Sequence, residues 1–243
     1  MKAKISEIFS SIQGEGLYLG KRQIFVRFYG CNMKCAYCDT IYHYGDSPKT
    51  GTVPVKELSI NEVINEIASL SLVRLGGTPL YKSTVSLTGG EPLVHVGYLK
   101  LLLKKLKSLG LETYLETNGT LPNALEDVIK MVDIIAMDIK LPSSTHDRSF
   151  WDEHEKFLKI AKGREVFIKI IVTGNTKKDE FEQAVRLIKN VAQTIPLIIQ
   201  PVTPCGIVKK ASNTKLDNFY NHASSVLKDV RIIPQVHKTM GYR

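Results

Sequence analysis

Short apolar runs alternate with longer amphipathic segments six times along this chain, and this alternation restricts its fold more than any other feature of the sequence. The runs predicted to be strands are residues 24–29, 84–87, 112–116, 134–137, 166–172 and 197–200. Apolar residues spaced three and four apart predict helices at residues 60–72, 99–109, 125–132, 150–161, 179–191 and 215–227. Strands that alternate with helices pair in parallel through right-handed crossovers, so we predict an α/β fold built on a parallel sheet.

Six strand–helix units are fewer than the eight that close a TIM barrel. Periodicity alone leaves two architectures open, namely an open, partial (βα)6 TIM-like barrel and a flat, doubly wound sheet. The chain has no evident linker and no internal repeat, so we expect a single domain over residues 1–243. In either architecture the loops that follow the carboxyl ends of the strands carry the chemistry.

The chain has 33 Lys and Arg residues against 24 Asp and Glu residues, a formal net charge of +9. Basic pairs such as Lys104-Lys105 and Lys209-Lys210 are spread along the sequence instead of forming the clustered basic face that nucleic acid requires. We therefore expect no nucleic-acid partner, whereas an anionic small substrate or an acidic protein partner suits the charge.

No apolar run approaches the ~20 residues that span a bilayer, and the N-terminus lacks the apolar core of a signal peptide. We expect a cytoplasmic protein with no membrane partner.

Three of the four cysteines, Cys31, Cys35 and Cys38, lie within eight residues directly after the first predicted strand, while Cys205 stands alone. In a reducing compartment such a cluster indicates metal binding or redox chemistry, not a disulfide framework. Three thiolates leave one coordination position without a local cysteine. Two kinds of centre fit this pattern: a zinc ion completed by His43, and a four-iron cluster whose fourth iron stays open to another ligand.

The cysteine motif, C-x3-C-x2-C with Tyr37 before its last cysteine, resembles that of the radical S-adenosylmethionine superfamily. Gly89-Gly90-Glu91-Pro92 and Glu116-Thr117-Asn118-Gly119, each at the end of a predicted strand, extend the resemblance. It implies a trimmed partial barrel, a 4Fe-4S cluster held by the three cysteines, and S-adenosylmethionine (SAM) bound to the open iron. The positions that the resemblance assigns to the cofactor are Tyr37, Cys38, Asp39, Gly90, Glu91, Glu116, Asp138, Lys140 and Gln200.

A second group of motifs resembles the 7-carboxy-7-deazaguanine synthase family of that superfamily. The motifs are Ser11-Ile12-Gln13-Gly14-Glu15-Gly16, Phe25-Val26-Arg27, Gly30-Cys31-Asn32, Cys38-Asp39-Thr40 and Pro234-Gln235-Val236-His237-Lys238. The resemblance implies a radical SAM enzyme that contracts the ring of 6-carboxy-5,6,7,8-tetrahydropterin to 7-carboxy-7-deazaguanine with loss of ammonia. Such an enzyme is a Mg2+-dependent carbon–nitrogen lyase of queuosine and 7-deazapurine biosynthesis.

The same resemblance implies roles for individual residues. The substrate-binding positions are Ile12, Gln13, Gly14, Glu15, Arg27, Thr88, His237 and the terminal carboxylate of Arg243. The Gln13 amide can donate and accept, Glu15 can accept from ring N–H groups, and Arg27 can pair with the pterin carboxylate. Thr40 corresponds to the family's Mg2+ ligand, with substrate and water completing the metal's shell. No side chain is assigned as a catalytic group, because the cofactor supplies the radical.

Alternatives remain open at several of these positions and for the function. Arg27 can instead form an ion pair at the strand end, Thr40 can hydrogen-bond its own loop, and Gln200 can satisfy a strand terminus. A glycyl-radical enzyme activating enzyme shares the cysteine loop and the Gly-Gly-Glu-Pro segment but acts on a protein. A non-catalytic zinc or RNA-binding module is the alternative outside enzymes. The resemblance further implies a homodimer, and the basic charge favours an acidic electron donor such as flavodoxin.

Overall fold

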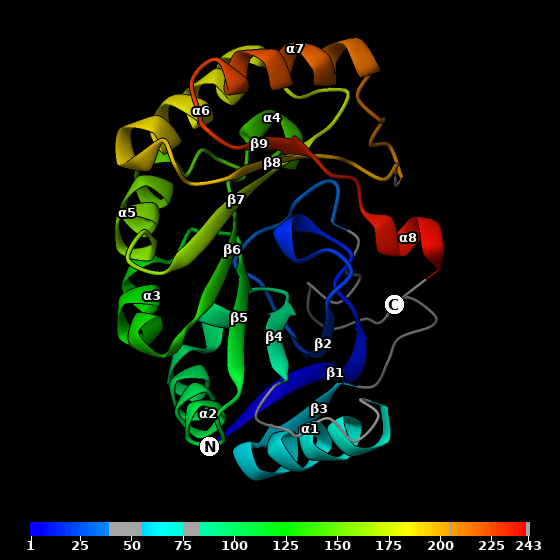
Figure 1. The fold of residues 1–243 in the computed structure, drawn as a ribbon, viewed down its shortest axis with the longest axis vertical. Coiled ribbons are helices and arrows are strands. Elements are labelled where there is room, and N and C mark those ends of the chain that lie inside the picture. The colour runs from blue at the N-terminus through cyan, green and yellow to red at the C-terminus, as the bar shows by residue number, and fades with distance from the viewer. Residues whose placement is uncertain (39–54, 75–82, 205, 242–243) are drawn as a thin grey trace.

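The computed structural model describes residues 1–38, 55–74, 83–204 and 206–241. Within these residues one sheet has the strand order β3-β1-β2-β4-β5-β6-β7-β8-β9 (Figure 1). The strands are β1 (Lys2–Ile12), β2 (Arg22–Phe28), β3 (Lys56–Ser59), β4 (Thr84–Gly89), β5 (Glu112–Thr117), β6 (Ile134–Asp138), β7 (Glu165–Val172), β8 (Leu197–Pro201) and β9 (Val230–Ile232). The edge strands β3 and β9 do not pair with each other, so the sheet is open.

All six predicted strands are present, as β2 and β4 to β8, with bounds within two residues of the predicted ones. They pair in parallel as expected, for example with Val26 beside Leu87 and Leu115 beside Ile135. The sequence pattern does not predict β1, β3 or β9. β1 pairs antiparallel with β2 and β3, and its pattern is weak because it buries serines such as Ser10. β3 and β9 are edge strands of four and three residues, too short to show a period.

The helices are α1 (Ile60–Arg74), α2 (Val96–Ser108), α3 (Pro122–Val128), α4 (Pro142–Thr145), α5 (Trp151–Ala161), α6 (Lys178–Ala192), α7 (Asn213–Ser224) and α8 (Val236–Met240). Short 3-10 helices lie at η1 (Gly16–Tyr18), η3 (Pro92–His95) and η4 (Ile129–Met131). Helices α2, α3, α5 and α6 lie along the outside of the curved sheet (Figure 1). Their buried side chains join those of the strands in one cluster that includes Leu102, Phe157 and Phe181. A doubly wound sheet carries helices on both faces, so the architecture is the partial barrel.

The inner face of the sheet changes from apolar to polar toward the carboxyl ends of the strands. Tyr114, Ala136 and Phe167 belong to a second cluster, which we call the apolar floor and which also contains Tyr18, Ile134 and Ile198. The residues two positions further along β5, β6 and β7 are Glu116, Asp138 and Lys169. Because side chains two apart on a strand share a face, these polar residues lie directly above the floor. No helix in the described part of the chain is long and apolar enough to cross a membrane.

Candidate active site

A cavity of about 490 Å³ opens above the apolar floor. Residues of β1, β2 and β4 to β7 line it, together with the cysteine loop (residues 30–38) and the C-terminal segment (residues 235–237). The predicted site residues on its wall are Ile12, Gln13, Gly14, Glu15, Arg27, Cys31, Cys35, Tyr37, Cys38, Thr88, Gly90, Glu116, Asp138, Lys140 and His237. The structure therefore gathers into one cavity most of the residues that the two groups of motifs predict.

The cysteine loop presents three free thiols to this cavity, all of them partly buried. Backbone hydrogen bonds hold the loop: within it, the Cys38 N–H donates to the Cys35 carbonyl at 3.0 Å, and the Ala36 N–H donates to the carbonyl of Thr145, the last residue of α4, at 2.8 Å. Burial raises the pKa of the Cys31 and Cys35 thiols. Among the described residues no fourth cysteine joins the three. Three soft thiols on one cavity wall fit an iron–sulfur cluster with one iron open to a ligand.

The zinc alternative gains no support from the described part of the chain. There, no group of three or more His, Cys, Asp or Glu side chains is arranged to hold a single metal ion. His43, the fourth ligand of that alternative, lies outside the described residues.

The Gly-Gly-Glu-Pro segment locks against the cysteine loop through its backbone. The Gly90 N–H donates to the Phe28 carbonyl at 3.0 Å, and the Glu91 N–H donates to the Gly30 carbonyl at 2.9 Å. A Cβ atom on Gly90 would lie 1.8 Å from the Gly30 carbonyl oxygen, which no side chain can tolerate. Glycine at position 90 is therefore required by the close approach of two loops.

Glu91 does not line the cavity, although the sequence places it at the cofactor. It is fully buried and accepts hydrogen bonds from the backbone N–H groups of Asn118 (2.7 Å) and Leu93 (3.1 Å) and from the Thr117 hydroxyl (2.9 Å). Burial raises its pKa to about 7, against these hydrogen bonds, which favour the charged form. Glu91 thus joins the loop after β4 to the loop after β5 from behind the cavity wall.

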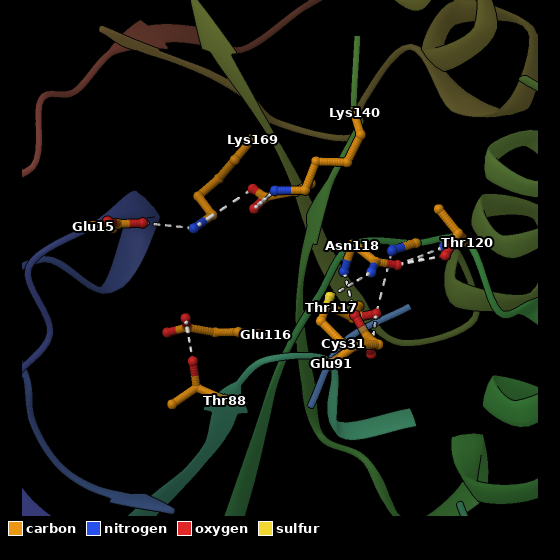
Figure 2. Close-up of polar contacts among 12 residues, drawn as sticks. Glu15, Cys31, Thr88, Glu91, Glu116, Thr117, Asn118, Thr120, Lys140 and Lys169 are labelled. Carbon is orange, nitrogen blue, oxygen red and sulfur yellow. Dashed lines mark hydrogen bonds and ion pairs between the residues drawn. The ribbon is translucent and has the colours of Figure 1, made fainter. Parts of the chain in front are cut away.

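Asn118 connects the loop after β5 to the cysteine loop (Figure 2). Its Nδ2 donates to Asn32 Oδ1 at 2.9 Å and lies 3.8 Å from Cys31 Sγ. Its Oδ1 accepts from the Thr120 backbone and hydroxyl, and Thr120 Oγ1 in turn accepts from Asn32 Nδ2 at 2.8 Å. This closed set of hydrogen bonds fixes the position of the first cysteine.

Glu116 holds two of the predicted substrate residues (Figure 2 shows its contact with Thr88). It accepts from Gln13 Nε2 at 2.9 Å through Oε1 and from Thr88 Oγ1 at 2.9 Å through Oε2. Gln13 is 3% exposed, and its amide also contacts Gln23 and the Glu15 N–H. The Gln13 amide is therefore held by the protein at the cavity wall, and its contact with the substrate stays a prediction. The Thr88 hydroxyl donates its hydrogen bond to Glu116, so toward the cavity it can act only as an acceptor.

A chain of alternating charges crosses the cavity wall (Figure 2). Glu15 Oε2 lies 2.6 Å from Lys169 Nζ, Lys169 Nζ lies 3.5 Å from Asp138 Oδ1, and Asp138 Oδ2 lies 2.8 Å from Lys140 Nζ. Gln235 Nε2 donates to Glu15 Oε1 at 2.7 Å. Burial favours neutral Glu15, but the charge and hydrogen bond of Lys169 outweigh it and lower the pKa of Glu15 to about 2. Both lysines likewise keep a raised pKa despite burial, because of Asp138.

Lys169 and Gln235 also line the cavity, and neither is among the predicted site residues. Lys169 stands in the otherwise apolar strand VFIKIIV, where a lone charge at an inward position was the available signal. Gln235 belongs to the quoted C-terminal motif, but its partner Glu15 is 220 residues away. Only the fold brings the two together.

Arg27 lines the cavity and also has a partner within the sheet. Its Nε lies 3.6 Å from Glu7 Oε2, and its guanidinium lies 5.6 Å from the centre of the Phe9 ring. The geometry therefore allows both alternatives for Arg27: an ion pair within the sheet and a cation that faces the cavity.

The C-terminal segment packs on the Gln13–Glu15 turn. The Val236 N–H donates to the Gly14 carbonyl at 3.0 Å, and a Cβ atom on Gly14 would lie 2.3 Å from His237 Nδ1. Gly14 is needed here because the imidazole occupies the space of a side chain. His237 reaches the cavity wall by this contact.

The remaining predicted residues lie elsewhere. Asp39, Thr40, Cys205 and Arg243 lie outside the described residues. Gln200 of β8 is fully buried and does not line the cavity. Neither atom of its side-chain amide has a hydrogen-bond partner among the described residues, so the strand-terminus alternative is not borne out in that part of the chain.

The chain is similar in sequence and in fold to known proteins. The Radical SAM superfamily model matches residues 25–188. The chain is 41% identical to the 7-carboxy-7-deazaguanine synthase of Geobacter sulfurreducens over 98% of this chain and 97% of that protein, and 34% identical to that of Methanothermobacter thermautotrophicus over 100% and 99%. QueE from Escherichia coli shares the fold, with a TM-score of 0.64 at 22% identity over 98% of this chain and 95% of that one. The chain belongs to the 7-carboxy-7-deazaguanine synthase family of the radical SAM superfamily.

Proposed function

We propose that this protein contracts the ring of 6-carboxy-5,6,7,8-tetrahydropterin to 7-carboxy-7-deazaguanine with loss of ammonia. It is then a radical SAM carbon–nitrogen lyase of queuosine and 7-deazapurine biosynthesis. The observation that carries this proposal is a cavity that joins three free thiols to a polar wall of Glu15, Arg27 and Thr88, in a chain that belongs to this family.

Residues of the chain suit each group that the reaction needs. Cys31, Cys35 and Cys38 would hold the 4Fe-4S cluster, and Tyr37, Gly90, Asp138 and Lys140 would hold SAM beside it. When bound, these groups supply the one-electron chemistry that removes a hydrogen atom from the substrate, and Mg2+ supplies a Lewis acid. Thr40, with Asp39 next to it, is the proposed Mg2+ position in the sequence.

The pterin would lie against the opposite wall. Glu15 and Thr88 both present acceptors, which suits the N–H groups of a reduced pterin, and Arg27 presents a cation for its carboxylate. Gln13 and Glu116 hold these acceptors in place, and His237 closes the edge of the cavity.

The partners of this enzyme follow from its charge and family. We expect an acidic electron donor of the flavodoxin type, a homodimer, and a cytoplasmic location, and the net charge of +9 supports the first of these. The described strands form one sheet, which supports a single domain. A reduction rate that does not fall with rising salt concentration would count against the acidic donor.

The direct test is anaerobic reconstitution with iron and sulfide, followed by reductant, SAM, Mg2+ and the carboxypterin. We expect 7-carboxy-7-deazaguanine by mass spectrometry, in an amount that depends on the pterin. An intact cluster that cleaves SAM without forming this product would overturn the proposal. If SAM cleavage then required a protein with a glycyl-radical loop, a glycyl-radical enzyme activating enzyme would replace the synthase as the proposed function.

A further inference from the structure

Lys169 is a buried lysine to which the family motifs assign no role. It lies on β7 in register with Asp138 of β6, and its side chain is 6% exposed. The inward residue before it, Phe167, belongs to the apolar floor. A lysine in such surroundings keeps its charge only where neighbouring groups offset the loss of water.

Two carboxylates, which come from opposite sides of the cavity, form ion pairs with Lys169, and Glu116 adds a further negative charge nearby. Lys169 Nζ lies 2.6 Å from Glu15, in the turn after β1, and 3.5 Å from Asp138, at the end of β6 (Figure 2 labels Lys169 and Glu15). Glu15 belongs to the proposed substrate wall and Asp138 to the proposed SAM wall. Lys169 therefore connects the two halves of the site.

The two carboxylates depend on Lys169 to different degrees. Asp138 has a second and closer cation, because Lys140 Nζ lies 2.8 Å from its Oδ2. Within the described part of the chain Glu15 forms an ion pair with one lysine, Lys169, and its other oxygen accepts from the neutral Gln235 amide. Removal of the Lys169 charge would thus leave Asp138 paired and Glu15 unpaired.

We infer that Lys169 is a positioning residue that holds the Glu15 carboxylate charged and directed at the substrate, and that it serves the substrate wall more than the SAM wall. The inference rests on the proposed function, because it takes the pterin to be the ligand of Glu15. A carboxylate fixed by a buried lysine is an acceptor already oriented for ring N–H groups, so binding requires no reorganisation.

The test compares Lys169→Met, which removes the charge and shortens the side chain by one heavy atom, with two matched variants. Lys140→Met removes the lysine that pairs with the opposite oxygen of Asp138, and Lys159→Met removes an exposed lysine that pairs with Glu155 on α5. Titration calorimetry on the anaerobic, reconstituted protein gives the Kd of SAM and, with SAM present, the Kd of 6-carboxytetrahydropterin. Turnover gives KM and kcat separately.

We expect Lys169→Met to weaken pterin binding about ten-fold or more while the Kd of SAM changes less than about three-fold. Lys140→Met should show the opposite asymmetry, and Lys159→Met should match the wild type. Lys169→Arg, which keeps the charge, should recover part of the pterin affinity. Equal losses for both ligands in Lys169→Met, or no loss of pterin affinity, would overturn the inference.

A second comparison covers the case in which Lys169→Met does not fold. It compares the single variant Glu15→Gln with the double variant Glu15→Gln/Lys169→Met. Neither protein has a charged Glu15 to lose its partner, so the double variant should bind the pterin less than about three-fold more weakly than the single variant. A further loss of about ten-fold would overturn the inference. A wild-type protein that binds no carboxypterin would instead overturn the proposed function, which the calorimetry detects before any variant is compared.

Discussion

His154 shows how one buried side chain supports the site from outside the cavity. It is fully buried on α5, and its Nε2 lies 3.1 Å from the carbonyl oxygen of Asn118, the residue that fixes Cys31. Burial lowers the pKa of His154 to about 4, against the effect of that carbonyl. Between about pH 4 and about pH 6.5, His154 is therefore neutral in the folded protein, whereas the same side chain is protonated in the unfolded chain.

This difference makes stability depend on pH. Between about pH 6.5 and about pH 4 the unfolded chain binds a proton that the folded protein does not, so the contribution of His154 is complete above about 6.5 and is lost as the pH falls toward 4, by roughly 3 kcal/mol. His154→Gln should flatten the pH dependence of the unfolding free energy across this range, measured with urea on the iron-free protein. His146→Asn, at an exposed left-handed position, should keep the wild-type dependence. An unchanged slope in His154→Gln would contradict this assignment.

The proposed Mg2+ site depends on one protein hydroxyl group, that of Thr40. Thr40→Ala should lower the rate several-fold and weaken the response to added Mg2+, because one ligand of the metal is gone, whereas Thr40→Ser keeps the hydroxyl and should retain the response. The measurement is turnover across a range of Mg2+ concentrations. An unchanged Mg2+ dependence in Thr40→Ala would count against the proposed ligand.

The loop after β4 and the cysteine loop act as one unit, because their backbones touch at Gly90. Gly90→Ala would force the two loops apart, so we expect it to lower the free energy of unfolding by more than about 2 kcal/mol and to reduce iron content after reconstitution. Urea unfolding and iron analysis measure both effects.

Gly97 provides the matched control for this change. It lies in α2, where the atoms nearest to an added Cβ belong to the Met1 side chain at 3.9 Å and beyond. Gly97→Ala should be neutral or stabilise the protein by up to about 1 kcal/mol, since alanine favours the helix. A full iron content and normal stability in Gly90→Ala would show that the loops do not depend on this contact.

The strands differ in how well the pattern of apolar residues predicts them. The period of apolar residues predicts β5 to β8 closely because both faces of these strands are covered by side chains of the chain itself, the helices outside and the floor inside. It does not predict β1, whose inner face meets the polar cavity through Glu7 and whose pairing partner β3 lies more than forty residues away. Motifs located the cysteines and Gly90 through local spacing. They missed Lys169 because its partners come from distant strands and loops.

At the scale of the whole molecule, the turn after β1 and the C-terminal segment form one edge of the cavity. A variant that ends at Pro234 loses the Gln235 donor to Glu15, the backbone bond to Gly14 and the His237 ring. Because the segment has no fully buried side chains, we expect the fold and the Kd of SAM to be retained while pterin affinity falls about ten-fold or more. Calorimetry with each ligand measures this.

A longer variant separates the parts of that edge. A chain that ends at Lys238 keeps Gln235, Val236 and His237, so any remaining loss of pterin affinity reports on residues 239–243, including the Arg243 carboxylate. Equal pterin affinity in the wild type and in the variant that ends at Pro234 would contradict a role for the C-terminal segment.

In the proposed function one cavity holds SAM and the pterin together, so that a hydrogen atom passes directly between them. Mass spectrometry of the compounds recovered after the reconstituted protein reacts with carboxypterin deuterated at C6 detects this transfer. The carboxypterin and the products 7-carboxy-7-deazaguanine and ammonia contain the same atoms, so a hydrogen atom must return to the substrate after the one at C6 is removed. We expect deuterium in the adenosyl group, recovered as labelled SAM or 5′-deoxyadenosine, whenever product forms. Product formed with no deuterium in either compound, or a labelled adenosyl group with no product, would contradict direct transfer.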